Sequence, residues 1–321
     1  MSDTITITTG TAGVAGNVSV DLQTYFAAKL LEVAEYNLVL DQFGEKVPLP
    51  PNSSQTIRFN RVEKLTLTTS PSELTQGEPP DADGLTLNQY EATVEQYGKV
   101  VRLSDLAELT AKHQLVQKAI YVLGLHASET YDILIYNVLD AASNEYRPNG
   151  ILSDATLLAG SLITYEDLIQ LNATLAGTGA KPIKDGLYAL VVCPMVHAGL
   201  LKDPDFKAAN QFVGAEKIFR GQVGQLGGTA VVQSNAPSFA VTTQTGSGYT
   251  NKVYSSFYIG NFAYQITDLQ SVQVYVAGPG GWSDPLHQSR KIGYKFAFKA
   301  KITNENWIRR VRSSGLDSAT V

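Results

Sequence analysis

The segment LTQGEPPDADGLTLNQYEATVEQYGKVVRLSD, residues 74–105, decides the fold that this sequence predicts. Its first half is acidic and rich in proline and glycine, which interrupt helices and strands. Its second half alternates apolar and polar side chains, which predicts a strand over about residues 85–103. Residues 65–98 hold six carboxylates and neither lysine nor arginine. The segment therefore lacks the apolar side chains that would bury it in a core of its own.

A second strand pattern precedes this polar segment, in QTIRFNRVEKLTL. Ile57, Phe59 and Val62 stand there among polar residues, so we expect a half-buried strand. Two strands joined by a long polar segment predict a hairpin that protrudes from the body. The open edges of such a hairpin are a liability in a monomer, because they present unpaired backbone groups. We therefore expect the hairpin to lie on a partner molecule.

The strongest helix pattern of the chain begins directly after the second strand, at Ser104. Apolar residues then recur every three or four positions, which is the spacing of one helix face. This stripe comprises Leu106, Leu109, His113, Val116, Ile120, Leu123, Ala127, Tyr131, Leu134 and Val138. Unbroken to about Ala141, the helix would be roughly 57 Å long at about 1.5 Å per residue. The simplest arrangement is one long helix lying across a sheet.

The rest of the chain mixes helix and strand patterns, which predicts an α+β fold in which the late strands return to the long helix. Helices are expected over residues 20–42 and 164–175 and from Pro194, and strands over 187–193, near 229–233 and 253–265, and in SVQVYVA. Residues 1–18 are small and polar and are expected to form a flexible arm. The glycine-rich GQVGQLGG and GTGAKP fit no phosphate-binding pattern and are interpreted as turns.

Composition places the chain among ordinary globular proteins. It has 321 residues, of which 44% are hydrophobic and 17% charged, enough for about two domains. The single cysteine, Cys193, excludes a disulfide within one chain and fits folding in a reducing cytosol. We see no signal peptide, and the most apolar window, residues 186–201, is shorter than a membrane span. No membrane contact is expected.

Charge is distributed unevenly along the chain. Residues 287–321 hold eight lysines and arginines and two acidic residues, a charge of +6, so the first 286 residues, with 17 basic and 28 acidic residues, carry −11. A basic segment could contact phosphate. The lysines of KIGYKFAFKAKI are separated by apolar residues, however, which favours a strand with one solvated or partner-facing side.

Metal binding is the first chemistry that the polar segment suggests. With Gly84 as the turn glycine of a calcium loop, Pro79 and Tyr90 occupy positions that require acidic ligands. Only Asp81 and Asp83 remain as ligands, so the calcium-loop pattern fails. We expect neither a metal nor another cofactor.

Nucleophilic catalysis is the second candidate chemistry. Cys193 and His197 could be nucleophile and base, but a buried thiol beside a packing histidine explains them better. His113 and His126 lie thirteen residues apart, about 220° around a helix, so they cannot share a metal there. No catalytic residue is predicted.

The order of these elements is similar to that in a known family. The segments that carry the resemblance are NLVLDQFGEKVPLPPNSSQTIRFNRVEKL, LTQGEPPD…LTLNQYEATVEQYGKVVRLSDL, AEKIFRGQVGQLGGTAVVQSN and GWSDPLHQSRKIGYKFAFKAKITNENWIRRVRSS. Together they resemble the major capsid proteins of tailed bacteriophages, which have the Hong Kong ninety-seven-type or Johnson fold, and within these the N-four-like phage branch. The resemblance runs from about Leu38 to Ser314. Gln76 departs from it, because a glutamate is expected there.

The resemblance implies an α+β phage major capsid fold with five parts. These are an N-terminal arm (1–47), an extended loop hairpin (48–103), a peripheral domain with the spine helix (104–160), an axial domain (161–252) and the returning strands of the axial and peripheral domains (253–321).

The resemblance also implies a structural, non-enzymatic protein. It would assemble in the host bacterial cytoplasm as hexamers and pentamers of an icosahedral virion shell around double-stranded DNA, without sequence-specific contact to that DNA. Portal, scaffolding and decoration proteins are the further expected partners. An acidic shell wall suits such a genome, because it repels DNA rather than trapping it.

The charge segregation suggests a specific contact between subunits. We expect Glu73, Glu78, Asp81 and Asp83 to face basic residues of an adjacent subunit, among them Lys291, Lys295, Lys299 and Lys301.

Three other interpretations stay open at this point. An encapsulin-type nanocompartment shares the fold but would enclose protein cargo. A nucleic-acid-binding protein would use the basic C-terminal region and bind DNA with a strong salt dependence. A cysteine or serine hydrolase would lose activity on Cys193→Ala or His197→Ala.

Overall fold

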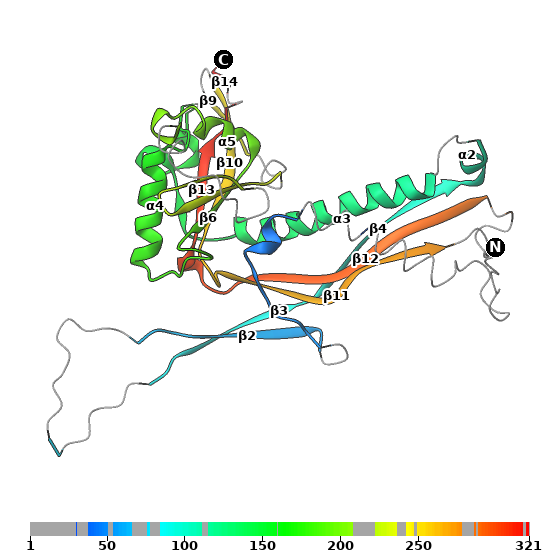
Figure 1. The fold of residues 1–321 in the computed structure, drawn as a ribbon, viewed down its shortest axis with the longest axis horizontal. Helices are drawn as coiled ribbons and strands as arrows, with labels where there is room; N and C mark the ends of the chain where they lie inside the picture. Colours follow the sequence, from blue (N-terminus) through cyan, green and yellow to red (C-terminus); the bar gives the residue numbers. More distant parts are fainter. Residues whose placement is uncertain are drawn as a thin grey trace, which may run out of the picture.

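The computed structural model describes residues 30, 38–50, 54–65, 76–77, 84–110, 115–158, 160–207, 222–235, 242–246, 249–277, 286, 288–316 and 319–320. The expected flexible arm, most of the expected helix over residues 20–42, and His113 lie outside these residues. The described chain contains a four-stranded sheet, an eight-stranded sheet and a two-stranded hairpin together with helices, so the α+β class is confirmed. Figure 1 shows an elongated molecule, with the larger sheet at one end and the hairpin projecting away from the body.

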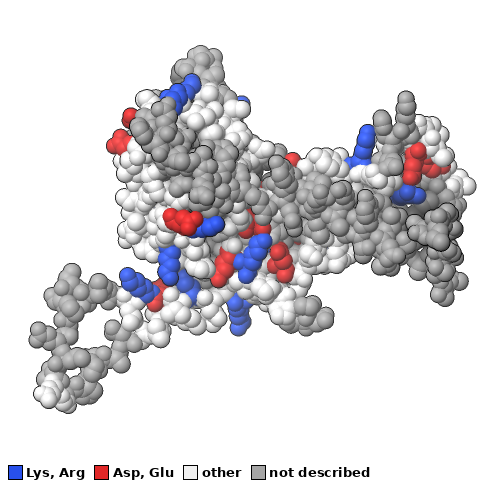
Figure 2. Space-filling view, in the orientation of Figure 1, with Lys and Arg blue, Asp and Glu red and all other residues white. Residues whose placement is uncertain are grey.

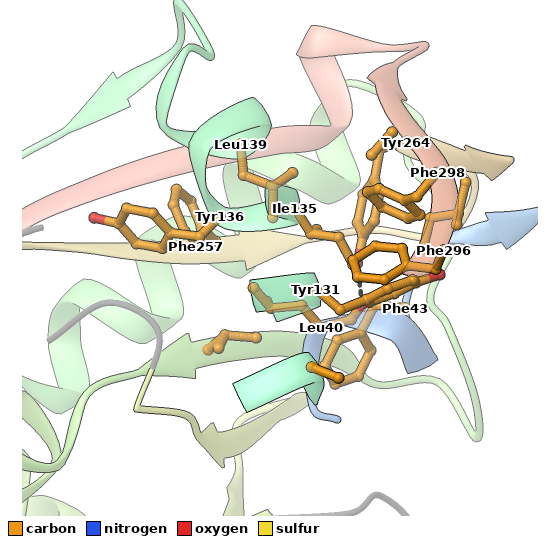
Figure 3. Close-up of a cluster of buried hydrophobic side chains, with 14 of the residues drawn as sticks. Leu40, Phe43, Tyr131, Ile135, Tyr136, Leu139, Phe257, Tyr264, Phe296 and Phe298 are labelled. Atoms are coloured by element: carbon orange, nitrogen blue, oxygen red, sulfur yellow. Dashed lines mark hydrogen bonds between the residues drawn. The ribbon is translucent and has the colours of Figure 1, made fainter. Parts of the chain in front are cut away.

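The long helix α3 (Leu115–Asp140) packs along the four-stranded sheet. The strand order is β1 (Glu45–Lys46), β11 (Tyr264–Ala277), β12 (Ser289–Ile302) and β4 (Glu95–Ser104); β1 is parallel to β11, and the other neighbours are antiparallel. Because strand side chains alternate between faces, β12 turns Tyr294, Phe296 and Phe298 towards the helix, where all three are buried. The ring of Tyr131 on α3 meets Phe298 with 4.2 Å between centroids (Figure 3). The late strands thus return to the long helix, as predicted.

The helix expected from Ser104 to Ala141 differs in the structure. A short helix, α2 (Asp105–Thr110), is separate from α3, and the residues between them lie outside the described chain. Ser104 caps α2 as expected, because its Oγ accepts a hydrogen bond from the Ala107 N–H at 3.3 Å. Leu106 and Leu109, however, are 68% and 83% exposed, so they do not join the buried stripe. The physical reason is that the pairing of β4 with β12 ends at Ser104, so the sheet stops where α2 begins.

The eight-stranded sheet forms the second layer of the molecule. Its order is β5 (Glu145–Tyr146), β13 (Ile308–Ser314), β10 (Tyr249–Ile259), β6 (Tyr188–Val192), β8 (Thr229–Gln233) and β7 (Gln222–Leu226), while β9 (Thr242–Gly246) and β14 (Ala319–Thr320) also pair with β10. Every residue of β6 is buried, which confirms the predicted core strand. The helices α4 (Tyr165–Gly177) and α5 (Pro194–Leu200) confirm the other two helix predictions; Thr164 and Asp167 form a capping box at the start of α4.

Two sequence interpretations in this part were incomplete. The strand expected near residues 253–265 is two strands, because β10 ends at Ile259 and β11 begins at Tyr264, in the other sheet. Phe262, with φ of 57°, lies in the turn through which the chain changes sheets. In GQVGQLGG, most residues form β7 rather than a turn. Among the described residues of this segment, only Gly227 and Gly228 turn, with positive φ values of 56° and 76°.

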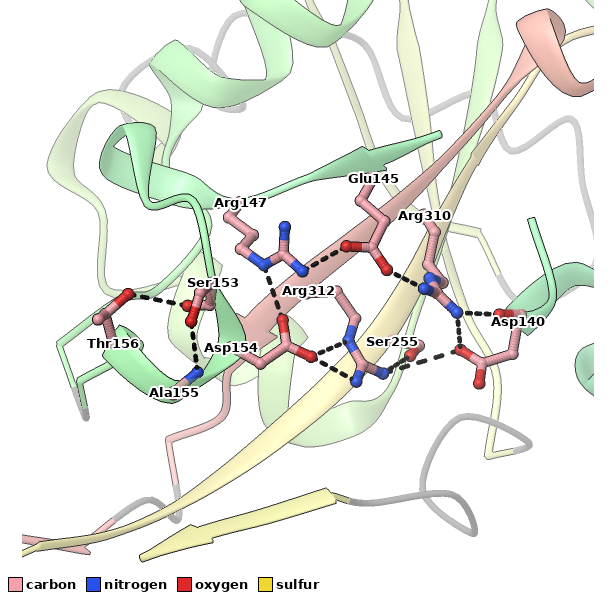
Figure 4. A network of polar contacts seen from close by, with 10 residues as sticks. All are labelled: Asp140, Glu145, Arg147, Ser153, Asp154, Ala155, Thr156, Ser255, Arg310 and Arg312. Atoms are coloured by element: carbon pink, nitrogen blue, oxygen red, sulfur yellow. Dashed lines mark hydrogen bonds and ion pairs between the residues drawn. The ribbon is translucent and has the colours of Figure 1, made fainter. Parts of the chain in front are cut away.

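A network of charged side chains joins the end of α3 to the larger sheet (Figure 4). Asp154, in a short 3₁₀ helix (Asp154–Thr156), accepts hydrogen bonds from Arg312 Nη2 and Arg147 Nε, both at 2.7 Å. Arg310 pairs with Glu145 and also donates to the Asp140 carbonyl at the end of α3. Paired charges in such a position need several hydrogen bonds to offset their burial, and Asp154 accepts three from the two arginines. It fixes the long helix to β5 and β13.

Further short 3₁₀ helices span Leu40–Gln42, Pro148–Gly150 and Glu305–Trp307. None of the helices in the described part of the chain has the length and apolar character that a membrane span requires.

Candidate interaction surface

The projecting hairpin consists of β2 (Thr56–Val62) and β3 (Leu87–Thr93), paired antiparallel (Figure 1). Alternation gives it two faces. On one face, Ile57, Phe59 and Ala92 are buried in a small apolar cluster with Val94 and with Ala297 of β12. This cluster lies at the base of the hairpin, so the base is the part that the subunit itself stabilises.

The outer half of the hairpin exposes apolar side chains. Val62, Leu65, Leu85 and Leu87 are 60%, 53%, 75% and 51% exposed. Val62 and Leu87 are cross-strand partners, on the face shared with Arg58 rather than with Phe59. The predicted half-buried strand is confirmed, because Ile57 and Phe59 are buried, while alternation along β2 places Val62 on the opposite, exposed face. We call these four residues the apolar end of the hairpin.

Arg61 fastens the hairpin to the body. Its Nη1 donates to the carbonyl of Thr303, which follows β12, at 2.9 Å, and its Nη2 contacts Glu63 at 2.8 Å. Its guanidinium also lies 5.9 Å from the ring centroid of Tyr90. The sequence analysis did not single out Arg61. Its position on the buried-face register of β2 was the available signal, because a charged residue there needs a partner.

The lysines of β12 lie on the face of the sheet opposite the long helix, as predicted. Lys291 and Lys301 are exposed, and Lys295 and Lys299 are partly buried. Lys299 contacts Glu95 at 2.9 Å, and Lys295 Nζ lies 5.8 Å from the ring centroid of Tyr275. Hydrogen bonds from Tyr97 and then from Lys299 lower the pKa of Glu95. We call these four lysines the lysine face.

The acidic residues predicted to meet such lysines, Glu73, Glu78, Asp81 and Asp83, all lie outside the described residues. The contact between them therefore stays a prediction. Among the described residues, acidic and basic side chains are interspersed on the face of the molecule seen in Figure 2, rather than gathered into one basic patch.

A groove of about 730 Å³ lies where the hairpin base meets the body. Its lining includes Arg61, Leu134, Val138, Phe298 and Ile302. β4 pairs with β12 only as far as Phe298, so within the described chain residues 299–302 have β11 on one side and no strand on the other. Such an edge can accept an additional strand.

Cys193 and His197 do not resemble a catalytic pair. The thiol is fully buried at the N-terminus of α5, and the backbone N–H of His197 donates to the Cys193 carbonyl at 3.0 Å. Burial lowers the pKa of the His197 imidazole. A thiol without solvent access cannot reach a substrate, which supports the packing interpretation. Among the described residues, no cluster of three or more histidine, cysteine, aspartate or glutamate side chains could hold a metal ion.

Solved structures share this architecture. The capsid of Ralstonia phage GP4 superposes with a TM-score of 0.61 at 14% identity over 99% of both chains. The capsid of cyanophage P-SCSP1u gives a TM-score of 0.62 at 13% identity over 87% of this chain and 88% of that one. A virus-like particle from Pyrococcus furiosus gives 0.55 at 12% identity, over 91% of this chain and all of that one. The predicted capsid fold is thereby confirmed.

Sequence comparisons address the family directly. No curated protein matches the chain. The model of the family described as phage capsid protein matches residues 89–308, more than half of the sequence. The chain belongs to the phage capsid protein family.

Proposed function

We propose that this bacteriophage capsid protein assembles as hexamers and pentamers into an icosahedral shell that encloses double-stranded DNA. The observation that carries the proposal is the hairpin, whose base is buried in its own subunit and whose apolar end is not. Complete burial of an exposed leucine or valine side chain stabilises an association by up to about 1.5–3 kcal/mol. A neighbouring copy that covers the apolar end therefore supplies the contact that the isolated subunit lacks.

Ion pairs contribute less than apolar burial to the proposed affinity between neighbouring subunits. The acidic residues Glu73, Glu78, Asp81 and Asp83 would meet the lysine face of the adjacent subunit. Exposed ion pairs contribute only about 0.2–1 kcal/mol each. We infer that the acidic segment sets the register of the hairpin on its neighbour, while the apolar end provides most of the affinity.

The five parts expected from the resemblance form the corresponding proposal for domains. The arm is 1–47, the extended loop 48–103, the peripheral domain 104–160, the axial domain 161–252, and the returning strands 253–321. The course of the chain supports the last of these parts, because β10 and β13 lie in the eight-stranded sheet and β11 and β12 in the four-stranded one.

The charge balance supports a shell that does not bind its genome tightly. The net charge is −5, and the lysines of β12 occupy one face of a sheet rather than a mobile tail. A negative wall repels DNA, so we propose that DNA is enclosed without sequence-specific contact. Assembly in the bacterial cytoplasm with portal, scaffolding and decoration proteins, and the absence of enzymatic activity, complete the proposal.

The experiment is electron microscopy of the purified protein and of two variants. We expect uniform closed shells from the wild type, and folded subunits without shells from Val62→Asp/Leu87→Asp, because two carboxylates cannot be buried in an apolar contact. The matched control is Leu152→Asp, because Leu152 is also apolar and is 92% exposed, away from the hairpin. Shells from the double variant in wild-type yield would overturn the proposed contact. A wild-type protein that stays monomeric under all assembly conditions would overturn the shell itself.

The lysine contact has a separate test. We expect Lys291→Glu/Lys295→Glu to slow assembly at low salt and to have little effect at high salt, because screening already removes the attraction there. Lys202→Glu, another exposed lysine, is the control. Equal assembly rates of the two variants at low salt would contradict the contact.

A shell that encloses protein instead of DNA is the second candidate. It stays a candidate because a virus-like particle from Pyrococcus furiosus has a similar fold, so the fold alone does not decide what the shell holds. The family match favours the phage shell. The contents of purified shells, measured by ultraviolet absorbance and mass spectrometry, distinguish DNA from protein cargo.

A further inference from the structure

Three carboxylates from distant parts of the chain meet where the N-terminal part of the described chain reaches the long helix. They are Asp132 of α3, Asp41 of the 3₁₀ helix Leu40–Gln42 and Asp268 of β11. The side chains of Asp41 and Asp132 are almost fully buried, in residues that are 7% and 5% exposed. The hydroxyl of Tyr131 lies 3.3 Å from Asp41 Oδ1 and 3.1 Å from Asp268 Oδ1, so one phenol links two of the three carboxylates.

The cluster fastens residues 38–43 to the body. The two carboxyl oxygens of Asp132 accept the N–H groups of Val39 and Leu40, each at 3.3 Å. The hydroxyl of Tyr264 donates to the Leu40 carbonyl at 2.5 Å. Leu40 and Phe43 then lie in the core beside Tyr131 (Figure 3). Side chains of α3 and β11 thus hold this segment by its backbone.

The electrostatic balance of the joint is unfavourable for ionised carboxylates. Among the described groups, Lys46 of β1 is the cation that contacts the cluster, at 2.6 Å from Asp41 Oδ2, and its side chain is 59% exposed. Tyr131 and Tyr264 face the carboxylates from α3 and β11, and β12 contributes the apolar rings of Phe296 and Phe298.

Burial raises the pKa of Asp132 to about 7, although the N–H groups of Val39 and Leu40 act in the opposite direction. Burial also raises the pKa of Asp268. The burial of Asp41 and Asp132 beside one largely exposed cation, Lys46, likewise favours the retention of a proton in the closed joint. Tyr131 and Tyr264 remain protonated, because burial raises the pKa of each phenol above its ordinary value.

We propose that this joint is a proton-operated latch, in which protonated Asp132 holds residues 38–43 against the long helix and ionised Asp132 releases them. In the closed latch the Asp132 carboxyl keeps its proton to a higher pH than it does once exposed to water, so opening the latch releases a proton. Opening is consequently favoured as pH rises, by up to about tenfold per pH unit between the ordinary aspartate pKa and that of the closed state. Above the higher of these two values the effect levels off. The segment that leads to the N-terminal residues thereby becomes freer in neutral than in acidic solution.

Hydrogen exchange of the full-length protein tests the latch, at pH values from 4.5 to 8.5 and in one fixed assembly state. The protection of the Val39 and Leu40 amides is normalised to that of β6, which corrects for the intrinsic pH dependence of exchange. We expect the normalised protection to fall several-fold per pH unit up to about pH 7 and then to level off. Protection that is constant or rises across this range in the wild type overturns the proposal without any variant.

Variants locate the responsible group. Asp132→Asn keeps the shape but cannot ionise, so most of the slope should disappear. The control is Glu129→Gln, which removes an exposed carboxylate from the same helix and should leave the slope unchanged. Tyr264→Phe removes a donor to Leu40 and should lower protection at every pH while keeping the slope. A wild-type slope in Asp132→Asn would show that another group carries the effect and would overturn the assignment.

Discussion

The hairpin and the eight-stranded sheet both consist of strands with apolar side chains, but they differ in what buries those side chains. All five residues of β6 are buried between neighbouring strands and helices of the same chain. In β2, by contrast, only Ile57 and Phe59 are buried, and the outer half ends in exposed Val62. One region thus reaches its full stability within the subunit, and the other leaves part of its apolar surface uncovered. The difference can be tested with matched substitutions in the two regions.

Phe257→Ala should have the largest effect on the subunit. Phe257 is fully buried in β10 and meets Tyr136 of α3 edge-on, with 5.2 Å between ring centroids. Removing a buried phenylalanine costs about 3–5 kcal/mol through lost burial and the cavity left behind. We expect a loss of this size in the free energy of unfolding, measured by guanidinium denaturation of the unassembled subunit.

Phe59→Ala is the same chemical change in the hairpin and should behave differently. Phe59 is 3% exposed, but its cluster is small and separate from the main core, so we expect it to open without the rest of the molecule. A separately opening unit loses its own protection first. We expect hydrogen-exchange protection of β2 and β3 to disappear, while the global free energy of unfolding changes by less than about 1 kcal/mol. Equal global losses for Phe59→Ala and Phe257→Ala would mean that the hairpin belongs to the main cooperative unit.

Arg312→Leu should rank next after Phe257→Ala in its effect on the global stability of the subunit. Arg312 is partly buried in the charged network of Figure 4, where it donates to Asp154 and, at 2.6 Å, to Ser255 Oγ. A hydrogen bond to a charged group contributes about 1.5–3 kcal/mol, and its loss leaves Asp154 with Arg147 alone. We expect a loss of that order in chemical denaturation. An unchanged midpoint would show that the network does not support the joint between α3 and the larger sheet.

Arg61→Ala and Arg58→Ala compare the two arginines of β2. Arg61 is tied to the Thr303 carbonyl, whereas Arg58 pairs with Glu91 in an exposed contact where the side chains are 67% and 57% exposed. We expect Arg61→Ala to weaken hairpin protection by about 1–2 kcal/mol and Arg58→Ala by less than about 0.5 kcal/mol. The measurement is hydrogen exchange of β3. The reverse ranking would contradict the anchoring role of Arg61.

The sequence correctly predicted those strands and helices in which the local spacing of apolar residues determines which side chains are buried. The alternation in β12 separates the lysines from the aromatic rings, and the unbroken apolar run of β6 matches its complete burial. The apolar period of α3 likewise matches the face that it buries from Ile120 to Tyr131, but beyond Tyr131 the helix buries Ile135 and Leu139, and the expected Leu134 and Val138 are only partly buried. In each case the local period alone decides which side chains face the core.

The features that the sequence did not predict depend on partners far along the chain. Leu106 fits the helical period, but the sheet beneath it ends at Ser104, because β12 begins there. The hydrogen bond between Asp132 and Leu40 joins residues 92 positions apart, and no local pattern signals it.

The smallest expected effect is that of pH on stability. Its sign differs between Asp154, in the arginine network, and Asp132, in the proton latch. Burial opposes ionisation of Asp154, but hydrogen bonds from Arg312 and then Arg147 outweigh it and hold the pKa of that carboxyl below its ordinary value of 3.8. Because the pKa is lower in the folded state, the stabilisation from Asp154 is present above about pH 4 and is lost as pH falls below it. Asp132 has the opposite sign, because its pKa is raised in the folded state, so its contribution is largest in acid and declines between about pH 4 and 7.

We therefore expect Asp154→Asn to lower the free energy of unfolding at neutral pH and to reduce its fall below pH 4. We expect Asp132→Asn to reduce the change in the free energy of unfolding between pH 4 and 7. Denaturation of the unassembled subunit across this pH range measures both. Identical pH profiles for the two variants would show that Asp132 and Asp154 do not titrate independently, and the distinction between the proton latch and the arginine network would then be lost.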